Sequence, residues 1–160
     1  YESVKGGFGA RPNKDGINAL SSGIANTMNT PIEALEMSFP LRVDCYEVIP
    51  NSGGQGKYRG GLGTRRAWTV LEKTARATVC MERTKSAPFG ISGGGSGSLG
   101  KAILKLPDGT EQNLPSKGAF DVPAGGQVIL EAPGSGGYGD KAERDQMANK
   151  SDIEDGYVTD

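Results

Sequence analysis

Seven polar side chains of this chain are candidates to line a site for a small polar molecule: Asp15, Asn26, Asn29, Glu33, Glu36, Arg59 and Arg83. The carboxylates and amides can exchange hydrogen bonds with a polar ligand, and each arginine can bind a carboxylate or phosphate through its planar fork of donors. Helix capping and surface ion pairing use the same residue types. Each position therefore also has a purely structural interpretation.

The chain contains no histidine among its 160 residues, which removes the commonest general base and the commonest metal ligand. We therefore assign no catalytic residue, no metal ligand and no bound cofactor to this chain. Cys45 and Cys80 lie in strand-like runs. We predict that both are small buried apolar residues and not disulfide partners or nucleophiles.

Charge and hydropathy narrow the possible partners. Lys and Arg number 18 against 19 Asp and Glu, and no basic block is present, which argues against a nucleic acid or an anionic membrane as partner. No apolar run approaches the roughly 20 residues that span a bilayer, and no signal peptide is visible. We expect a cytoplasmic protein that acts on a small molecule.

Alternation of apolar and polar residues predicts a mainly β fold, a sandwich or distorted barrel of roughly eight short antiparallel strands. Residues 41–48 alternate clearly. Residues 64–71 and 75–81 are predicted to pair, as are 120–122 and 127–132, and residues 101–106 form a hairpin with 111–114 through a Pro-Asp-Gly turn.

Two helical segments flank the predicted strands. Thr30-Pro31-Ile32-Glu33 matches a capping box and predicts a short helix over about residues 31–37, ended by Pro40. Asp140 with Glu143 predicts a helical tail to about residue 150, with a second turn over 151–156. We divide the chain into an irregular segment with the helix (1–40), a β-rich core (41–132), and a glycine loop with the helical tail (133–160). Together these are expected to form one domain of a larger protein.

Two glycine-rich stretches need interpretation. Residues 51–63 contain six glycines between two predicted strands and carry Lys57, Tyr58 and Arg59, which indicates a long turn region. Residues 95–101 match the dinucleotide pattern G-x-G-x-x-G and most of a phosphate-binding loop. Both motifs require a helix directly afterwards. The residues that follow predict a strand, so we reject nucleotide binding here.

Several phrases in order resemble the C-terminal portion of the hydantoinase B/oxoprolinase family. They are Gly6-Gly7-Phe8-Gly9-Ala10, Asn26-Thr27-Met28-Asn29-Thr30-Pro31-Ile32-Glu33-Ala34-Leu35-Glu36, Ser52-Gly53-Gly54-Gln55-Gly56-Lys57-Tyr58-Arg59-Gly60-Gly61-Leu62-Gly63, Glu82-Arg83, Pro88-Phe89-Gly90 and Gly136-Gly137-Tyr138-Gly139-Asp140. Together they run through essentially the whole chain. The sequence contains glycines, asparagines and acidic residues at the positions that carry this resemblance, but no histidine where family members often have one, in residues 18–25.

The resemblance implies a role inside an ATP-dependent enzyme. Such enzymes pair a B-type chain with an ATP-binding A-type chain and hydrolyse hydantoins, 5-oxoproline or lactams, or carboxylate acetone or acetophenone, after ATP phosphorylates a carbonyl or enol oxygen. The implied partners are an A-type subunit and the remainder of a B-type subunit in a hetero-oligomer. ATP and a divalent metal (Zn, Mg or Mn) are expected on those parts, so this chain is not expected to be catalytic alone. The missing histidines leave the substrate open.

A second interpretation is a non-catalytic β-rich module for assembly or ligand binding. In that case exposed loop aromatics such as Tyr58 and Tyr138 would make the contacts. The two interpretations differ in whether companion chains supply the nucleotide and metal sites.

Overall fold

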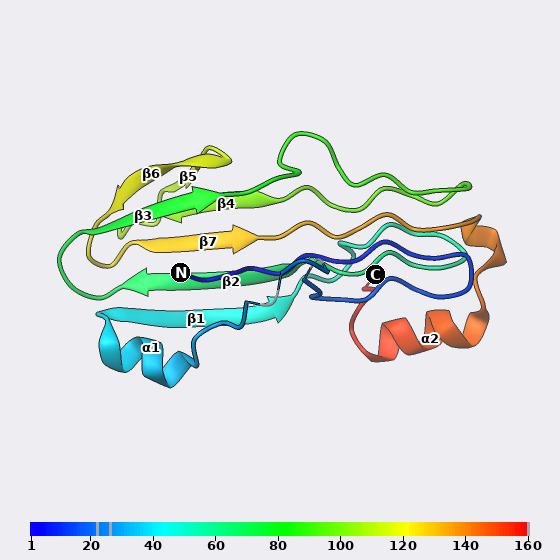
Figure 1. The fold of residues 1–160 in the computed structure, drawn as a ribbon, viewed down its shortest axis with the longest axis horizontal. Coiled ribbons are helices and arrows are strands. Elements are labelled where there is room, and N and C mark those ends of the chain that lie inside the picture. Colours follow the sequence, from blue (N-terminus) through cyan, green and yellow to red (C-terminus); the bar gives the residue numbers. More distant parts are fainter. Residues whose placement is uncertain (22, 26, 160) are drawn as a thin grey trace.

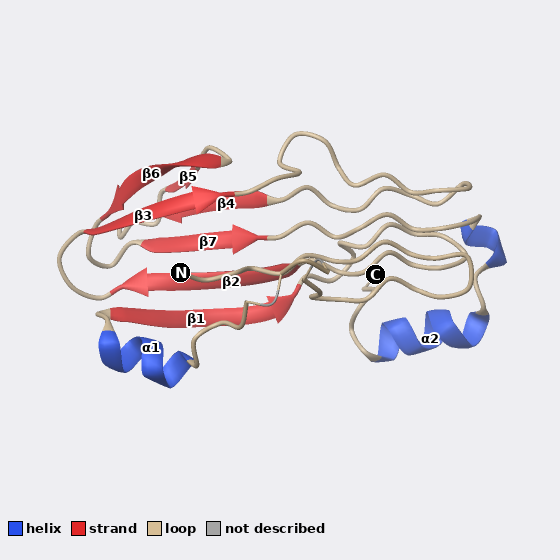
Figure 2. Ribbon diagram, in the orientation of Figure 1, coloured by secondary structure: helices blue, strands red, loops and turns tan. Residues whose placement is uncertain are grey.

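The computed structural model describes residues 1–160 except 22, 26 and 160. The larger of its two antiparallel sheets has five strands in the order β1-β2-β7-β4-β5 (Figures 1 and 2). Their bounds are β1 Leu41–Val48, β2 Thr64–Val70, β7 Gln127–Glu131, β4 Lys101–Lys105 and β5 Glu111–Asn113. The smaller sheet pairs β3 (Ala75–Cys80) with β6 (Lys117–Val122).

A hydrophobic core joins strands of both sheets. Val70, Leu104 and Val128 of the larger sheet pack with Val122 of β6, and Ala75 and other partly buried apolar residues surround them. The alternation in β3 buries Val79 and exposes Cys80, as a strand with one core-facing side must. The prediction of a mainly β fold of short antiparallel strands is thus confirmed, with seven strands instead of roughly eight and no closed barrel in the described part.

Two of the three predicted strand pairings are wrong. The hairpin of β4 with β5 is present, but β2 pairs with β1 and β7, and β3 pairs with β6. The turn after β2, where Lys73 has φ 56°, and the turn before β7, where Gly125 has φ 77°, each carry the chain from one sheet to the other. The consecutive strands β2 and β3, and likewise β6 and β7, therefore meet face to face across the core instead of edge to edge.

The helices occur where expected but are capped differently. The first, α1 (Ile32–Ser38), has Pro31 at its N-cap and no side-chain cap, and it ends before Pro40 as predicted. The amide of Thr30 donates to Glu2 Oε1, so the predicted capping box with Glu33 is wrong. In the tail, Asp140 caps only the 3₁₀ turn η1 (Lys141–Glu143). A single helix follows, α2 (Gln146–Glu154), which Asp145 caps.

Four glycine-rich stretches run side by side as extended segments beyond the ends of the strands (Figure 2). We call residues 5–19, 51–63, 88–99 and 133–139 the glycine bundle. Backbone hydrogen bonds join its segments: Gly61 donates to Phe8 (2.9 Å), Ser135 to Gly61 (2.9 Å) and Gly95 to Gln55 (2.6 Å). Residues 51–63 are therefore not the long turn that we predicted but part of this hydrogen-bonded layer.

Absence of side chains allows the bundle segments to touch. A Cβ atom placed on Gly60 would lie 1.9 Å from the carbonyl oxygen of Ser135, and one on Gly7 would lie 1.9 Å from that of Gly61. Both distances are far below van der Waals contact. Glycine is required at these positions by the closeness of the neighbouring backbone.

Two further predictions have clear outcomes. The strand β4 follows residues 95–100 directly, which confirms the reason for rejecting a nucleotide loop. Both cysteines are free, but Cys45 is only partly buried and Cys80 is exposed, so their predicted burial is wrong. Among the residues that the structure describes, no helix is long and apolar enough to cross a membrane.

Candidate functional site

The predicted site residues lie in three separate parts of the molecule. Asp15 and Arg59 meet in the glycine bundle next to α2. Asn29, Glu33 and Glu36 lie in or just before α1, which is at the opposite end of the molecule from α2 (Figure 1). Arg83 lies on the loop after β3. Asn26 lies outside the described residues. The structure thus brings Asp15 and Arg59 together and separates them from the group at α1.

The guanidinium of Arg59 binds several partners within the chain. Its side chain is 8% exposed, and its Nε donates to Asp152 Oδ2 at 3.1 Å. Its Nη1 donates to Asn18 Oδ1 at 3.2 Å and to the Gly60 carbonyl at 2.8 Å. The ring of Tyr157 lies 5.3 Å from its Cζ atom, close enough for a cation–π contact.

Arg144 completes a network of two arginines and two aspartates. It binds Asp15 with both terminal nitrogens, at 2.9 and 3.0 Å, and it also donates to Asp152. We call Asp15, Arg59, Arg144 and Asp152 the ionic network. Its charges balance, and it joins the 3₁₀ turn and α2 region to the glycine bundle, which has no other charged contact as buried as this among the described residues.

Asp15 should make the stability of the chain depend on pH. Burial by itself raises the pKa of Asp15, but hydrogen bonds from Arg144 and from the Arg59 amide, with the charges of both arginines, hold it below its usual value. A group whose pKa is lower in the folded state stabilises the fold above its unfolded pKa, about 3.9. That stabilisation is lost as pH falls through the folded value.

We predict that replacing Asp15 with Asn costs about 1.5–3 kcal/mol at pH 7, the range for hydrogen bonds to charged groups. The cost should shrink as the pH falls below about 3.9 and through the lowered pKa of the folded state, because the carboxyl of the parent chain then becomes protonated as well. Urea unfolding of both chains at pH 7, 5 and 3 measures this difference. An equal cost at every pH would contradict the assignment of an ionised Asp15 to the network.

The residues near α1 fasten the N-terminal segment and an edge strand. The Ser3 amide donates to Asn29 Oδ1 at 2.9 Å. The Val43 amide donates to Glu36 Oε1 at 2.7 Å, so α1 covers part of the outer edge of β1. Glu33 is exposed in the first turn of α1. These contacts leave the predicted substrate-lining role of the group untested.

Two charged residues that the sequence prediction did not assign to a site also hold the N-terminal segment. Arg66 of β2 is 1% exposed and forms an ion pair with Glu2 at 2.8 Å. The rings of Tyr46 and Trp68 lie 4.9 and 5.3 Å from its Cζ atom. Residues two apart in a strand share a face, so Arg66 lies on the same face as Trp68, and this spacing was the signal in the sequence for an inward-facing charge.

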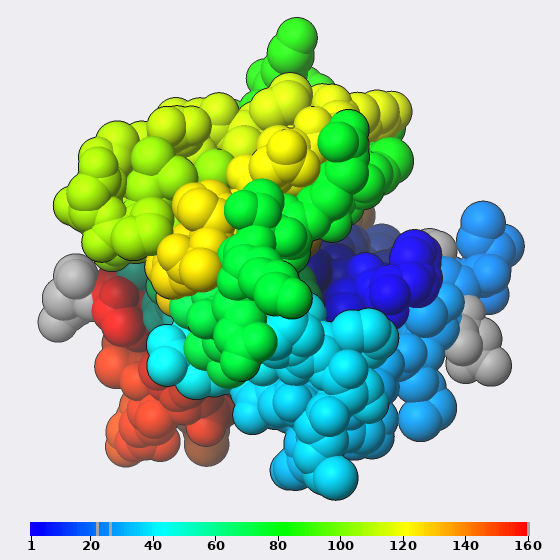
Figure 3. All heavy atoms as spheres, turned by 90° about the vertical axis from the view of Figure 1, so that its left-hand side faces the viewer, coloured from blue at the N-terminus to red at the C-terminus, as the bar shows by residue number. Residues whose placement is uncertain are grey.

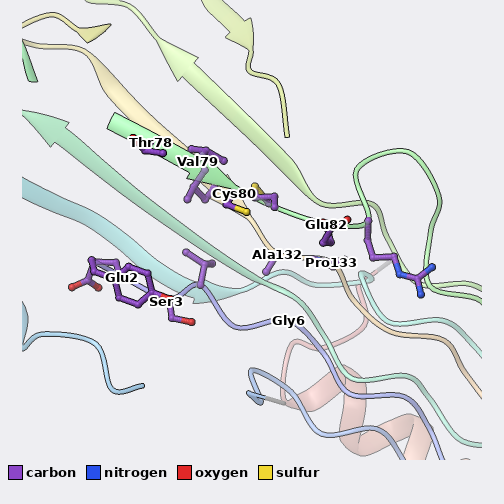
Figure 4. A pocket seen from close by; sticks show the side chains of 14 residues that line it. Glu2, Ser3, Gly6, Thr78, Val79, Cys80, Glu82, Ala132 and Pro133 are labelled. Atoms are coloured by element: carbon purple, nitrogen blue, oxygen red, sulfur yellow. The ribbon is translucent and has the colours of Figure 1, made fainter. Parts of the chain in front are cut away.

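Arg83 borders a hollow of about 620 Å³. Its backbone has a φ of 59°, and its carbonyl accepts a hydrogen bond from the Gly100 amide at 3.0 Å. The opposite side of the hollow is formed by the N-terminal segment, including Glu2 and Ser3 (Figure 4). Among the described residues no cluster of three or more His, Cys, Asp or Glu side chains could hold a metal ion.

Comparison of the sequence with known proteins identifies the family of this chain. The sequence profile of hydantoinase B/oxoprolinase matches residues 1–141. The chain belongs to the hydantoinase B/oxoprolinase family.

Relatives and solved structures agree with this membership. A 5-oxoprolinase from Dictyostelium discoideum is 34% identical over 88% of this chain and 11% of its own length. The crystal structure of ATP-dependent caprolactamase from Pseudomonas jessenii matches 98% of this chain and 28% of its own chain at 31% identity, with a TM-score of 0.85. A nucleotide-free acetone carboxylase has the same fold, with a TM-score of 0.75 at 20% identity over 98% of this chain and 25% of its own.

The relatives that match are much longer than this chain. It spans 28%, 26% and 11% of the length of the first three curated relatives. Nearly all of this chain is matched, so the chain corresponds to one part of each of these longer relatives.

Proposed function

We propose that this chain is the C-terminal module of a B-type subunit in an ATP-dependent enzyme that hydrolyses a cyclic amide or carboxylates a ketone. The observation that carries the proposal is the caprolactamase match, which covers 98% of this chain but 28% of the other at a TM-score of 0.85. Nearly every residue of this chain thus corresponds to one part of a larger ATP-dependent enzyme.

The proposal assigns the reaction centre to other polypeptides. ATP and a divalent metal would bind to an A-type subunit and to the remainder of the B-type subunit, because this chain contains no histidine and its glycine-rich residues 95–100 lead into a strand. ATP would transfer its γ-phosphoryl group to the carbonyl oxygen of the amide or the enol oxygen of the ketone. Water or a carbon electrophile then completes the reaction and phosphate leaves.

This chain would contribute residues that line the substrate site and residues that contact the neighbouring subunits. Exposed Glu33 and Arg83 are free to face a substrate or a neighbouring subunit, and Asn29 and Glu36 would line the same region as Glu33. Asp15 and Arg59 are proposed to act indirectly, by holding α2 and the glycine bundle in one arrangement through the ionic network. Asn26 remains a candidate from the sequence.

One observation favours the alternative of an assembly module without a substrate contact. The side chains of Asp15, Asn29, Glu36 and Arg59 all bind partners within this chain. Tyr58 and Tyr138 would not be its contact points as we expected. Both are only partly exposed, and their backbones pair with each other at 2.9 Å.

The composition of the purified assembly tests the proposal. The chain is co-expressed with the A-type polypeptide and the rest of the B-type polypeptide from the same source, purified through a tag on this chain, and weighed by native mass spectrometry. We expect a hetero-oligomer that contains an ATP-binding chain. A monomer of this chain alone, with both companions soluble in the same lysate, would overturn the proposal.

A further inference from the structure

The hollow of about 620 Å³ is a groove between two parts of the chain that are far apart in sequence. One wall is the last half of β3 with the residues after it, and the other is the N-terminal segment. Its floor contains Leu130 of β7 and Ala132, the residue that directly follows β7. Figure 4 shows Thr78, Val79 and Cys80 on one side and Glu2 and Ser3 on the other. In Figure 3 the start of the chain, in dark blue, lies between the green of β3 and the cyan of α1 and β1.

The wall formed by β3 carries unpaired backbone groups. Met81 donates to Ser116, and the register pairs Val79 with Gly118 and Cys80 with Lys117. Along an antiparallel strand, the backbone amide and carbonyl of one residue point towards the paired strand, and those of the next residue point towards the opposite edge. Val79 therefore bonds to β6, while the amides and carbonyls of Thr78 and Cys80 point away from β6, on the side of the groove. No strand in the described residues pairs with that edge of β3.

The opposite wall is held firmly in place. Glu2 forms its ion pair with buried Arg66, and the Ser3 amide donates to Asn29. The Thr64 hydroxyl donates to the carbonyl of Lys5 at 2.5 Å. The groove is thus a fixed slot with a row of free hydrogen-bonding groups on one side and an apolar floor.

We infer that this groove receives an extended strand from the remainder of a B-type subunit, which adds to the free edge of β3. The inference rests on the proposed function. An extended segment offers alternating amides and carbonyls that match the free edge, and its alternate side chains would fall on Leu130 and Ala132. Those side chains must be apolar. Side chains near Glu82 and Arg83 at the end of the groove would be polar.

Two observations favour this occupant. The chain spans only 28% and 26% of the first two curated relatives, so in a B-type subunit most of the polypeptide would be tethered near the groove at a high effective concentration. A second copy of this chain fits poorly. Its edge strand β5 has only three residues, and its β1 edge is partly covered through Glu36.

Amide hydrogen exchange in the co-purified assembly tests the inference. Exchange of Thr78 and Cys80 is compared between the free chain and the assembly with the remainder of the B-type subunit. We expect both amides to slow at least tenfold, while Val79, already bonded to β6, changes little. Thr78→Pro, which removes an outward donor, should weaken the association at least tenfold. Arg76→Pro removes the equivalent donor outside the groove and serves as the matched control, with less than a twofold change.

The possible outcomes separate the two proposals. An assembly in which Thr78 and Cys80 exchange as fast as in the free chain, or in which β5 becomes protected instead, would overturn the strand addition and leave the proposed function standing. Failure of any assembly to form would overturn the proposed function, and the strand addition with it. Equal loss of association in Thr78→Pro and Arg76→Pro would also contradict the groove as the binding edge.

Discussion

Replacing Gly60 with alanine is expected to cost at least about 4–5 kcal/mol of stability, which places it among the most damaging single substitutions. The new Cβ would lie 1.9 Å from the Ser135 carbonyl oxygen and 2.8 Å from that of Gly136. The two segments would have to separate by more than about 1 Å, because 1.9 Å is shorter than an ordinary carbon–oxygen contact by roughly that amount. Separation would also break the bonds between Ser135 and Gly61 and between Gly54 and Ser135.

Gly9 provides the matched control for this prediction. It lies in the same bundle, but a Cβ placed on it would meet nothing within 4 Å, and its φ is not positive. Gly9→Ala should therefore change stability by less than about 1 kcal/mol, because alanine mainly restricts the unfolded chain. Thermal unfolding of both variants measures the difference. Similar melting temperatures for Gly60→Ala and the parent chain would contradict the close packing of the bundle.

Replacing Asp152 with asparagine is expected to cost about 3–5 kcal/mol, the range for removing one partner of a buried ion pair. Asp152 is 6% exposed and accepts hydrogen bonds from both Arg59 and Arg144. Its loss leaves two buried guanidinium groups with Asp15 as their single carboxylate. For a chain of this size the cost corresponds to a fall of about 6–20 °C in melting temperature.

Glu154 offers the control on the same helix. It pairs with Lys150 at 3.6 Å on the exposed surface, where the side chains are 65% and 76% exposed. Glu154→Gln should change stability by no more than about 0.5 kcal/mol. Amide exchange of α2 would show whether the helix detaches first in Asp152→Asn. Equal effects of the two substitutions would show that the ionic network does not hold α2.

Alternation along the chain was enough to locate most of the strands, because one face of such a strand is more buried than the other whatever its partner. Pairing could not be found in this way. The turns at Lys73 and Gly125 move the chain between sheets, and nothing in the spacing of apolar residues distinguishes such a crossing from a hairpin. The glycine stretches were located but interpreted as turns, because the need for glycine at Gly60 arises from Ser135, a residue far away in the sequence.

The candidate site was predictable only in part, for a similar reason. Sequence indicated Asp15 and Arg59 as polar groups of interest, and the structure places them in one network. Their partners Arg144 and Asp152 were missed because the contacts span 129 and 93 residues and have no local pattern. The only local signal is the polar character of the tail, which leaves it too little apolar surface to fold alone. In the structure the tail binds the glycine bundle through the ionic network.

ATP-dependent turnover by the purified chain and by the assembly is the most direct test of the central claim, that this chain is a module and not a complete enzyme. Release of ADP is measured with lactams, 5-oxoproline, hydantoins, and ketones with bicarbonate, for the 160-residue chain alone and with the A-type and remaining B-type polypeptides added. We predict background ADP release from the chain alone and substrate-dependent release from the assembly. Full ATP-dependent turnover by the isolated chain would contradict the claim.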